Sequence, residues 1–317
     1  MKTFLVTAIG SFSSGAVLDT LRKDKTNRLV GCDIYPKNWL PNAEKFDVFY
    51  QVHKANQKEY ISSIVNICEK EQIDFILPLT DHEVDVLSEK VSVFNNINTK
   101  VCISDRNAII FCRNKINYSL CFDKERNINT IPFYLGRDIK RKTIEFPIIA
   151  KPINGRSSEG LSLIEDMENL LYHIKYKKNY MFQPYIQGDI VTVDVVRDKL
   201  NNVISIPRVE LIRTKNGAGI TVRIFRDNIL TKITKKIVDI LDIKGCVNIE
   251  FIRNKDKYYL MDINPRFSAG IAFSILAGYN FVSNHIKCFE DNKIDTSLNY
   301  NEMILTRQYV ELITEDI

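Results

Sequence analysis

Three polar side chains recur at every second position near residue 260. In YYLMDINPRFSAG, the residues Asp262, Asn264 and Arg266 are separated by single apolar residues. Residues i, i+2 and i+4 of a strand point to the same face. The spacing therefore predicts a strand that presents an acid, an amide and a guanidinium on one face.

The preceding strand carries a matching polar face. In CVNIEFIR, Asn248 and Glu250 alternate with apolar residues, and NKDK joins this strand to the next as a hairpin. A three-residue loop at 255–257 puts Glu250 opposite Asp262 and Asn248 opposite Asn264, with opposed Cβ atoms roughly 4.5–5.5 Å apart. Two carboxylates held this closely repel unless a cation lies between them or one is protonated. Removing one charge is then expected to leave stability unchanged or to raise it.

This hairpin is a candidate metal and phosphate site. Oxygen ligands such as Glu250, Asp262 and Asn264 suit Mg²⁺, which is usually held by one or two carboxylates together with substrate phosphates. Arg266, one step beyond, could hold a phosphate through two hydrogen bonds. The alternative is a half-exposed hairpin whose polar face simply contacts water.

A second candidate stretch is FPIIAKPINGRSSEG. Lys151 follows an apolar run, and a loop with Gly155, Ser157, Ser158 and Gly160 comes directly after it. Such a loop can bring backbone N–H groups close to phosphate oxygens, and the lysine could reach the same anion. A hairpin with a flexible tip is the alternative. About thirty residues later, 180–186 is apolar enough to line an adenine slot.

Two kinds of element must position these residues. Strands at 3–8, 28–34, 73–79 and 100–104 alternate with helix-like segments such as 57–71, which predicts a parallel α/β layer. Ser104 is expected to cap a helix over about 105–122 that carries Lys115. The later strands follow one another as hairpins with few helices, mainly 166–176 and 228–241. They indicate an α+β part with an antiparallel sheet.

The composition is that of an ordinary globular protein. The 317 residues are 45% hydrophobic, and the net charge of +5 is spread without a basic block, so no nucleic-acid partner is expected. The N-terminal apolar run MKTFLVTAIGS is too short for a signal peptide or a membrane span. Seven cysteines without metal-like spacing indicate reduced thiols. We expect a cytoplasmic protein without a membrane partner.

Taken together, these stretches resemble the ATP-grasp superfamily, in the branch of carbamoyl-phosphate synthetase large-subunit domains and related carboxylate–amine ligases. The resemblance covers nearly the whole chain. It implies a Rossmann-like pre-ATP-grasp domain at 1–103 and an ATP-grasp domain at 104–317, with lobes at about 104–178 and 179–317. The implied activity is formation of an acyl phosphate from ATP and a carboxylate, followed by attack of an amine.

The resemblance also implies roles for single residues. It makes Lys151 and Arg266 catalytic and Glu250, Asp262 and Asn264 the ligands of Mg²⁺, with Mn²⁺ as an alternative ion. It implies that ATP is bound by Lys115, Lys151, Gly155, Ser157, Ser158, Gly160, Gln183, Pro184, Tyr185, Ile186 and Asp189. The family usually has a glutamate at the position of Asp262, and a ribose-binding glutamate where this chain has Ile190, for which Asp189 is the nearest substitute. A homodimer is compatible with the resemblance.

The acceptor side is less defined by the sequence. Arg208, Glu210, Arg213 and Arg223 lie in strands between the apolar stretch and the hairpin, and any of the arginines could bind a substrate carboxylate. The cluster 80–83 (TDHE) ends a parallel strand, where small ligands bind in α/β sheets. A solvated sheet face is the alternative for the arginines.

Two other functions stay open at this stage. The first is a nicotinamide-dependent oxidoreductase, suggested by TAIGSFSSGAVLD after a strand and by Asp33 further on, although G-x-G-x-x-G is incomplete. The second is a non-catalytic ATP-binding regulatory protein with the same fold, whose signature would be loss of the metal ligands.

Overall fold

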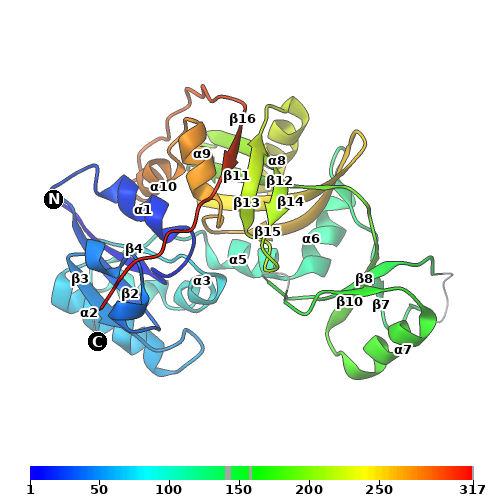
Figure 1. The fold of residues 1–317 in the computed structure, drawn as a ribbon, viewed down its shortest axis with the longest axis horizontal. Coiled ribbons are helices and arrows are strands. Elements are labelled where there is room, and N and C mark those ends of the chain that lie inside the picture. Colours follow the sequence, from blue (N-terminus) through cyan, green and yellow to red (C-terminus); the bar gives the residue numbers. More distant parts are fainter. Residues whose placement is uncertain (140–143, 157–158, 316–317) are drawn as a thin grey trace.

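The first hundred residues form a parallel sheet of five strands in the order β3-β2-β1-β4-β5 (Figure 1). The computed structural model describes residues 1–139, 144–156 and 159–315. The strands are β1 (Thr3–Thr7), β2 (Arg28–Asp33), β3 (Val48–Gln51), β4 (Phe75–Leu77) and β5 (Lys100–Val101). The helices are α1 (Ser14–Leu21), α2 (Glu59–Glu71), α3 (Asp81–Ser88) and α4 (Val91–Asn95), with 3-10 turns at Lys37–Trp39 and Ala43–Lys45. The predicted parallel α/β layer is confirmed.

A larger sheet of seven strands occupies the middle of the molecule, in the order β16-β13-β12-β11-β14-β15-β6. Its strands are β6 (Asn129–Thr130), β11 (Asp189–Arg197), β12 (Val203–Arg213), β13 (Gly219–Ile224), β14 (Gly245–Asn254), β15 (Lys257–Asn264) and β16 (Met303–Thr306). The helices α8 (Asn228–Ile240), α9 (Ile271–Ala277) and α10 (Phe281–Phe289) accompany it. Its neighbours pair antiparallel except for the short β6, which confirms the expected antiparallel sheet.

A small lobe projects from this body (Figure 1, green). Its four strands run in the order β7-β10-β8-β9, with α7 (Met167–Tyr176) packed on them around Leu170. The strands are β7 (Tyr134–Leu135), β8 (Ile148–Pro152), β9 (Ser162–Ile164) and β10 (Tyr180–Pro184). Because β10 pairs with β8, this sheet extends past residue 178, and the division of the chain into lobes at 178/179 stays a prediction.

The helix expected at 105–122 is two helices. α5 (Arg106–Arg113) begins after Asp105, whose side chain accepts a hydrogen bond from the Asn107 N–H. α6 (Lys115–Phe122) begins after Asn114, whose side chain caps its first turn. Ser104 is therefore not the cap; its hydroxyl donates to the Lys244 carbonyl instead. The break places Lys115 in the first turn of a helix rather than in the middle of one.

The parallel layer and the large sheet share one apolar core, which includes Phe4 and Val17 from the former and Ile206 and Phe281 from the latter. His285 on α10 crosses this boundary: its Nδ1 accepts the Cys246 N–H at 2.8 Å, and its Nε2 lies 3.1 Å from the Cys102 carbonyl oxygen. Burial lowers the pKa of His285 to about 4, so the ring is neutral at pH 7. The two parts are thus joined by packing as well as by polar contacts.

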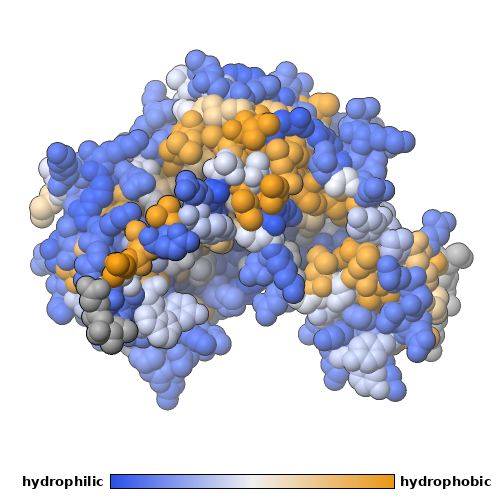
Figure 2. Space-filling model, viewed as in Figure 1, coloured by the Kyte–Doolittle hydropathy of each residue, from blue (hydrophilic) through white to orange (hydrophobic). Residues whose placement is uncertain are grey.

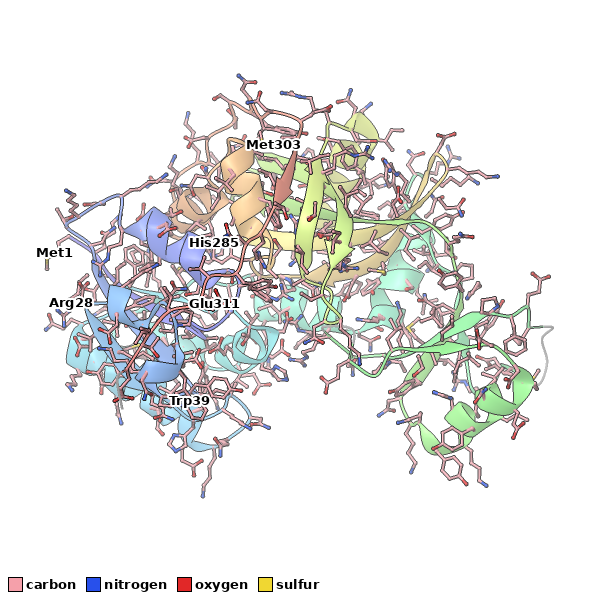
Figure 3. The ribbon with its side chains drawn as sticks, in the orientation of Figure 1. Met1, Arg28, Trp39, His285, Met303 and Glu311 are labelled. Carbon is pink, nitrogen blue, oxygen red and sulfur yellow. The ribbon has the colours of Figure 1, made fainter. Side chains whose placement is uncertain are left out.

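The C-terminal segment returns across the parallel layer. After β16 the chain runs over that layer, and Glu311 lies above it (Figure 3). Thr314 donates to the Asn38 carbonyl there. None of the helices in the described ranges is long and apolar enough to span a lipid bilayer.

Candidate active site

A cavity of about 470 Å³ lies where the large sheet, the small lobe and the parallel layer meet. In the space-filling view the surface is hollowed between the parallel layer and the small lobe (Figure 2). The cavity floor is one face of the large sheet, which presents Thr192, Arg208, Glu250 and Asp262 in a row across four neighbouring strands. The opposite face carries apolar residues that pack in a separate core with α8. One face of the sheet therefore forms the polar site, and the other face packs on the apolar core that supports it.

The hairpin β14–β15 brings the predicted metal ligands together. Glu250 is paired with Asp262 and Asn248 with Asn264, as the sequence predicts. The turn is nevertheless one residue shorter than expected, because Asn254 pairs with Lys257. A bulge between the Phe251–Leu260 and Glu250–Asp262 pairs restores the register. The bulge leaves an extra residue, Met261, on the cavity side next to the acid.

Each carboxylate of the pair has its own cation. Lys115 Nζ lies 3.0 Å from Asp262 Oδ1, and Arg213 Nη2 lies 3.4 Å from Glu250 Oε2. Burial raises the pKa of Glu250; the charge of Arg213 opposes this shift, and that of Asp262 adds to it. The repulsion expected from the sequence is therefore offset by two basic side chains from outside the hairpin.

Lys151 lies in β8 at the mouth of the small lobe and lines the same cavity. Its side chain is buried, and no ion pair or hydrogen bond joins its ammonium group to a described residue. Burial, together with the charge of Lys115, lowers the pKa of Lys151 to about 8. A buried ammonium without a partner is a group prepared to receive an anion.

The loop after β8 closes one side of the cavity. The Gly155 carbonyl accepts a hydrogen bond from Lys115 Nζ at 2.9 Å, and Arg156 Nη1 lies 3.0 Å from Asp85 Oδ2 of α3. Gly160 has φ +73°, and a Cβ there would lie 2.6 Å from the Tyr180 hydroxyl, so only glycine fits. Ser157 and Ser158 lie outside the described residues, and their part in phosphate binding stays a prediction.

The residues predicted to contact adenine, 183–186, lie at the end of β10 and outside the cavity that the two lysines line. Gln183 is buried and its Nε2 donates to the Ile131 carbonyl; Pro184 is paired with Ile148, and Tyr185 is half exposed. Like Ile186, these residues are not among those that line the described cavity, so their contact with adenine stays a prediction.

Asp189 does not face the cavity within the described residues. Its Oδ2 lies 2.5 Å from Arg253 Nη2, and the neighbouring Ile190 lines the cavity instead. Strand alternation turns the side chain of Asp189 away from the described cavity, and its role as a substitute for a ribose-binding glutamate stays a prediction.

Arg266 lines the cavity, and its guanidinium is fixed by an ion pair with Asp81. Its Nη2 donates to Asp81 Oδ2 at 2.9 Å, and Arg113 Nη1 lies 2.8 Å from the other Asp81 oxygen. Burial alone would raise the pKa of Asp81, but Arg266 and Arg113 hold it below its ordinary value. Thr80 and Glu83 form a capping box at the start of α3. The TDHE cluster thus fixes Arg266 and the start of α3. It does not line the described cavity, and a part for it in acceptor binding stays a prediction.

The three arginines considered for binding the acceptor substrate lie in different surroundings. Arg208 and Arg213 line the cavity, whereas Arg223 is exposed and lies beside β16. Every nitrogen of Arg208 is already engaged: Nε with Glu210, Nη1 with Asp194 and Nη2 with Ser268. Arg213 donates to the Gly217 carbonyl and faces Glu250.

Some cavity residues were missed by sequence reasoning. Phe12 reaches the cavity from the turn after β1, and the loop 216–219 closes the far end. The sequence carries no local signal for Phe12, because its place follows from packing of the parallel layer on the large sheet. Met261 could have been found only by anticipating the bulge.

In the glycine turn that suggested a nicotinamide site, Asp33 already accepts hydrogen bonds from the protein's own backbone. Asp33 Oδ2 accepts the Gly10 N–H at 2.8 Å, and Asp33 Oδ1 accepts the Tyr35 N–H at 3.1 Å. A Cβ at position 10 would lie 2.9 Å from Leu40 Cδ2. This aspartate stabilises the turn and is buried, so it has no free oxygen directed at a ribose.

The donor set fits Mg²⁺. Glu250, Asp262 and Asn264 supply oxygen atoms from two paired strands, and all three line the cavity beside two lysines. This combination of hard oxygen ligands with nearby cations is the kind of site that holds Mg²⁺ together with a polyphosphate.

Comparison with known proteins gives two family matches. Residues 177–311 match the family model described as ATP-grasp in the biosynthetic pathway with Ter operon, and residues 5–102 match the PylC-like N-terminal domain. The chain is similar to the carbamoyl phosphate synthase large chain of Clostridium beijerinckii, with 29% identity over 146 residues. That alignment covers 42% of this chain and 14% of the relative, so the chain matches only a small part of the curated relative.

Solved structures share the fold over almost the whole chain. Biotin carboxylase from Campylobacter jejuni aligns with TM-score 0.78 and 18% identity, over 93% of this chain and 72% of that one. N5-carboxyaminoimidazole synthetase from Staphylococcus aureus aligns with TM-score 0.74 and 16% identity, over 96% and 82%. The biotin carboxylase domain of the Hydrogenobacter thermophilus 2-oxoglutarate carboxylase, solved with MgADP, aligns with TM-score 0.76 and 14% identity, over 92% and 70%.

Proposed function

Because this chain belongs to the ATP-grasp superfamily, we propose that it is an ADP-forming ligase that joins a carboxylate to an amine. The observation that carries the proposal is the convergence of Lys115, Lys151, Glu250 and Asp262 on one cavity. A paired acid face, two lysines and a glycine-containing loop provide for a polyphosphate and its metal ion, and they have no comparable use in a purely structural sheet.

We assign the nucleotide end of the reaction as follows. Lys115 and Lys151 bind phosphate oxygens of ATP, and the loop 154–160 covers them with backbone N–H groups. Residues 183–186 bind adenine, mainly through the backbone. Mg²⁺, held by Glu250, Asp262 and Asn264, neutralises phosphate charge when bound, and Mn²⁺ is an alternative ion.

The proposed chemistry has two steps. An oxygen of the substrate carboxylate attacks the γ-phosphorus, the bond to ADP breaks, and an acyl phosphate forms. Arg266, fixed by Asp81, stabilises the charge on the transferred phosphoryl group. The amine then attacks the acyl carbon, the amide bond forms, and phosphate leaves.

Binding of ATP requires one rearrangement of the site. Lys115 Nζ now contacts both Asp262 and the Gly155 carbonyl. For Asp262 to receive Mg²⁺, this ammonium group must turn toward the nucleotide phosphates. The exchange leaves both groups paired, so its free-energy cost is small compared with exposing either charge.

The test is ADP release by the purified protein with Mg²⁺-ATP, against pools of carboxylates and amines. We expect release that needs both a carboxylate and an amine, and mass spectrometry should detect an amide that is lighter by one water than the two substrates together. ADP release that needs neither would contradict the ligase. Tight ATP binding without stimulated release in any pool would instead indicate the non-catalytic ATP-binding protein.

A further inference from the structure

The two carboxylates of the β14–β15 hairpin are paired with cations that the chain itself supplies. Asp262 Oδ1 lies 3.0 Å from Lys115 Nζ at the start of α6, and Glu250 Oε2 lies 3.4 Å from Arg213 Nη2 at the end of β12. The four side chains are at most 21% exposed, so salt screens the two pairs weakly. Any divalent ion that takes these carboxylates as ligands therefore competes with both cations for their negative charge.

The charges around the hairpin favour an anion over a lone divalent cation. Lys151 lies close enough to Lys115, Asp262 and Glu250 for the charge of each to act on it, and its own ammonium group has no ion-pair partner among the described residues. Three cations thus surround two carboxylates when Arg213 is included. Such a group attracts a polyphosphate and opposes the approach of a further positive charge.

Both paired cations have a second acceptor that allows them to leave their carboxylates. Lys115 Nζ also donates to the Gly155 carbonyl at 2.9 Å, and Arg213 Nε donates to the Gly217 carbonyl at 3.0 Å. Leaving a buried carboxylate without a new counter-charge is costly, whereas leaving it for a nearby phosphate keeps the charge compensated. A polyphosphate in this cavity supplies that compensation, and a metal ion alone does not.

From these contacts we propose that Lys115 and Arg213 close the metal site to a divalent ion until a polyphosphate binds. This inference rests on the ligase function proposed above and adds an order to it: the nucleotide phosphates bind before the metal ion or together with it. Lys115 turns to the phosphates and frees Asp262, while Arg213 stays on the Gly217 carbonyl and frees Glu250. The two residues act as a gate on metal binding.

The test measures metal binding without turnover, so it needs neither the carboxylate nor the amine. Mn²⁺ is the probe, because the electron paramagnetic resonance signal of the free ion disappears when the ion binds. Without nucleotide, Lys115→Met and Arg213→Met should each bind Mn²⁺ at least about five-fold more tightly than the wild type, the lower end of the usual coupling between two sites. A smaller gain in either variant would overturn the gating role of that residue.

Two controls separate the local pairs from the net charge of the protein. Lys115→Arg keeps a cation beside Asp262, and its Mn²⁺ affinity should stay within about two-fold of the wild type. Lys178→Met removes one positive charge at an exposed position and should have as small an effect. A gain in either control as large as that of Lys115→Met would overturn the gate.

Binding of ADP distinguishes failure of the gate from failure of the ligase proposal. Calorimetry with ADP in EDTA and then in Mn²⁺ should show binding at least about five-fold tighter with the ion, and a smaller factor in Arg213→Met, because the two affinities are coupled reciprocally. An equal ADP affinity of the wild type with and without Mn²⁺ would overturn the gate and leave the nucleotide site intact. A wild type that binds no ADP under either condition would overturn the proposed function, and the gate with it.

Discussion

Two buried polar clusters of this protein use the same residue types in different ways. At the junction between the parallel layer and the large sheet, Asp81 lies within 2.9 Å of both Arg113 and Arg266. On the cavity floor, Lys151 is equally buried, but no ion pair or hydrogen bond joins its ammonium group to a described residue. Burial is similar in both places, so burial alone does not distinguish a structural cluster from a site.

What distinguishes them is whether the charges are satisfied by the chain itself. A buried ion pair whose partners are complete stabilises one arrangement, and removing one partner is costly. A buried charge without a partner lowers the stability of the free protein and lowers its own tendency to be charged. Such a group becomes favourable when a ligand of opposite charge binds to it. The predictions that follow test this distinction at four positions.

The largest effect is expected for Lys151→Met. Loss of a phosphate contact in a shielded site should reduce turnover about 10³-fold, which corresponds to roughly 4 kcal/mol. The variant should also be more stable than the wild type at pH 7, by up to about 3 kcal/mol, because the pKa of Lys151 is lowered to about 8 by burial and by Lys115. Turnover assays and thermal melting measure the two effects. Lys178→Met, at an exposed position of the same lobe, is the control.

The lowered pKa of Lys151 also predicts how the stability of the protein changes with pH. A lysine whose folded pKa is lowered makes the folded state less stable below that pKa, and this penalty disappears between pH 8 and the unfolded value near 10.5. The wild type should therefore gain stability relative to Lys151→Met over this range. Its kcat/KM for ATP should fall above pH 8, as the ammonium group facing Lys115, Asp262 and Glu250 loses its charge. A flat profile up to pH 10 would remove Lys151 from the phosphate site.

The second prediction concerns Asp262→Asn. Turnover should fall about 10²-fold and the Mg²⁺ requirement should rise, because a ligand charge is lost. Without metal, the melting temperature should fall by an amount equivalent to about 1–2 kcal/mol, since Lys115 loses its partner at 3.0 Å. The sequence alone predicts the opposite sign, from repulsion with Glu250. Asp256→Asn in the exposed turn of the same hairpin is the control, and full Mg²⁺-dependent turnover in Asp262→Asn would contradict the metal assignment.

The third prediction concerns Asp81, at the junction between the parallel layer and the large sheet. Asp81→Asn should lower the free energy of unfolding by about 3 kcal/mol, because Arg113 and Arg266 then lack a buried counter-charge. Turnover should fall by about ten-fold at most, since Arg266 stays in place but is no longer fixed. Glu89→Gln, which affects an exposed pair with Arg106, should change stability by less than about 0.5 kcal/mol. If Asp81→Asn lost activity without losing stability, Asp81 would belong to the site rather than to its support.

The floor of the cavity could be predicted from the sequence because a sheet has a period of two. Asn248, Glu250, Asp262 and Asn264 alternate with apolar residues, and the structure places all four on the cavity side. The predicted pairing is right for a reason that the sequence did not reveal: a shorter turn and a bulge compensate for each other. Lys151 was identified by its place before a loop of small residues and Lys115 by family resemblance, and their roles stay a prediction.

The remaining features depend on contacts between distant parts of the chain. Asp81 and Arg266 are 185 positions apart and meet only when the parallel layer packs on the large sheet. The same packing brings Phe12 to the cavity. Glu250 and Asp262 receive their cations from other elements, Arg213 at the end of β12 and Lys115 at the start of α6. The break before Lys115 depends on capping by Asn114, a local signal that the apolar periodicity of 105–122 concealed. A sequence pattern predicts which face of a strand or helix is polar. It does not predict which residues from distant parts of the chain will contact that face.

The smallest effect is expected where the two clusters are linked. Arg156 in the loop over the cavity pairs with Asp85 at 3.0 Å, and Asp85 also accepts from Arg113 Nε at 2.6 Å. Both partners of the first pair are partly exposed, so Arg156→Gln should lower stability by less than about 1 kcal/mol. The loop should nevertheless open more often, because this pair and the contact of Lys115 with the Gly155 carbonyl tie it down. Backbone amides of residues 154–156 should exchange about two- to five-fold faster without nucleotide, and the KM for ATP should shift by a similar factor.

Hydrogen exchange with and without Mg²⁺-ATP measures this effect, and Arg137→Gln, at an exposed position of the same lobe, is the control. With ATP bound, the variant and the wild type should show the same protection, because the nucleotide then holds the loop through the two lysines. A KM that rises a hundred-fold with unchanged exchange would show that Arg156 binds the nucleotide itself. Arg156 would then belong with the unsatisfied cations of the site, and its pairing with Asp85 would be the resting position of a ligand-binding side chain rather than an extension of the junction.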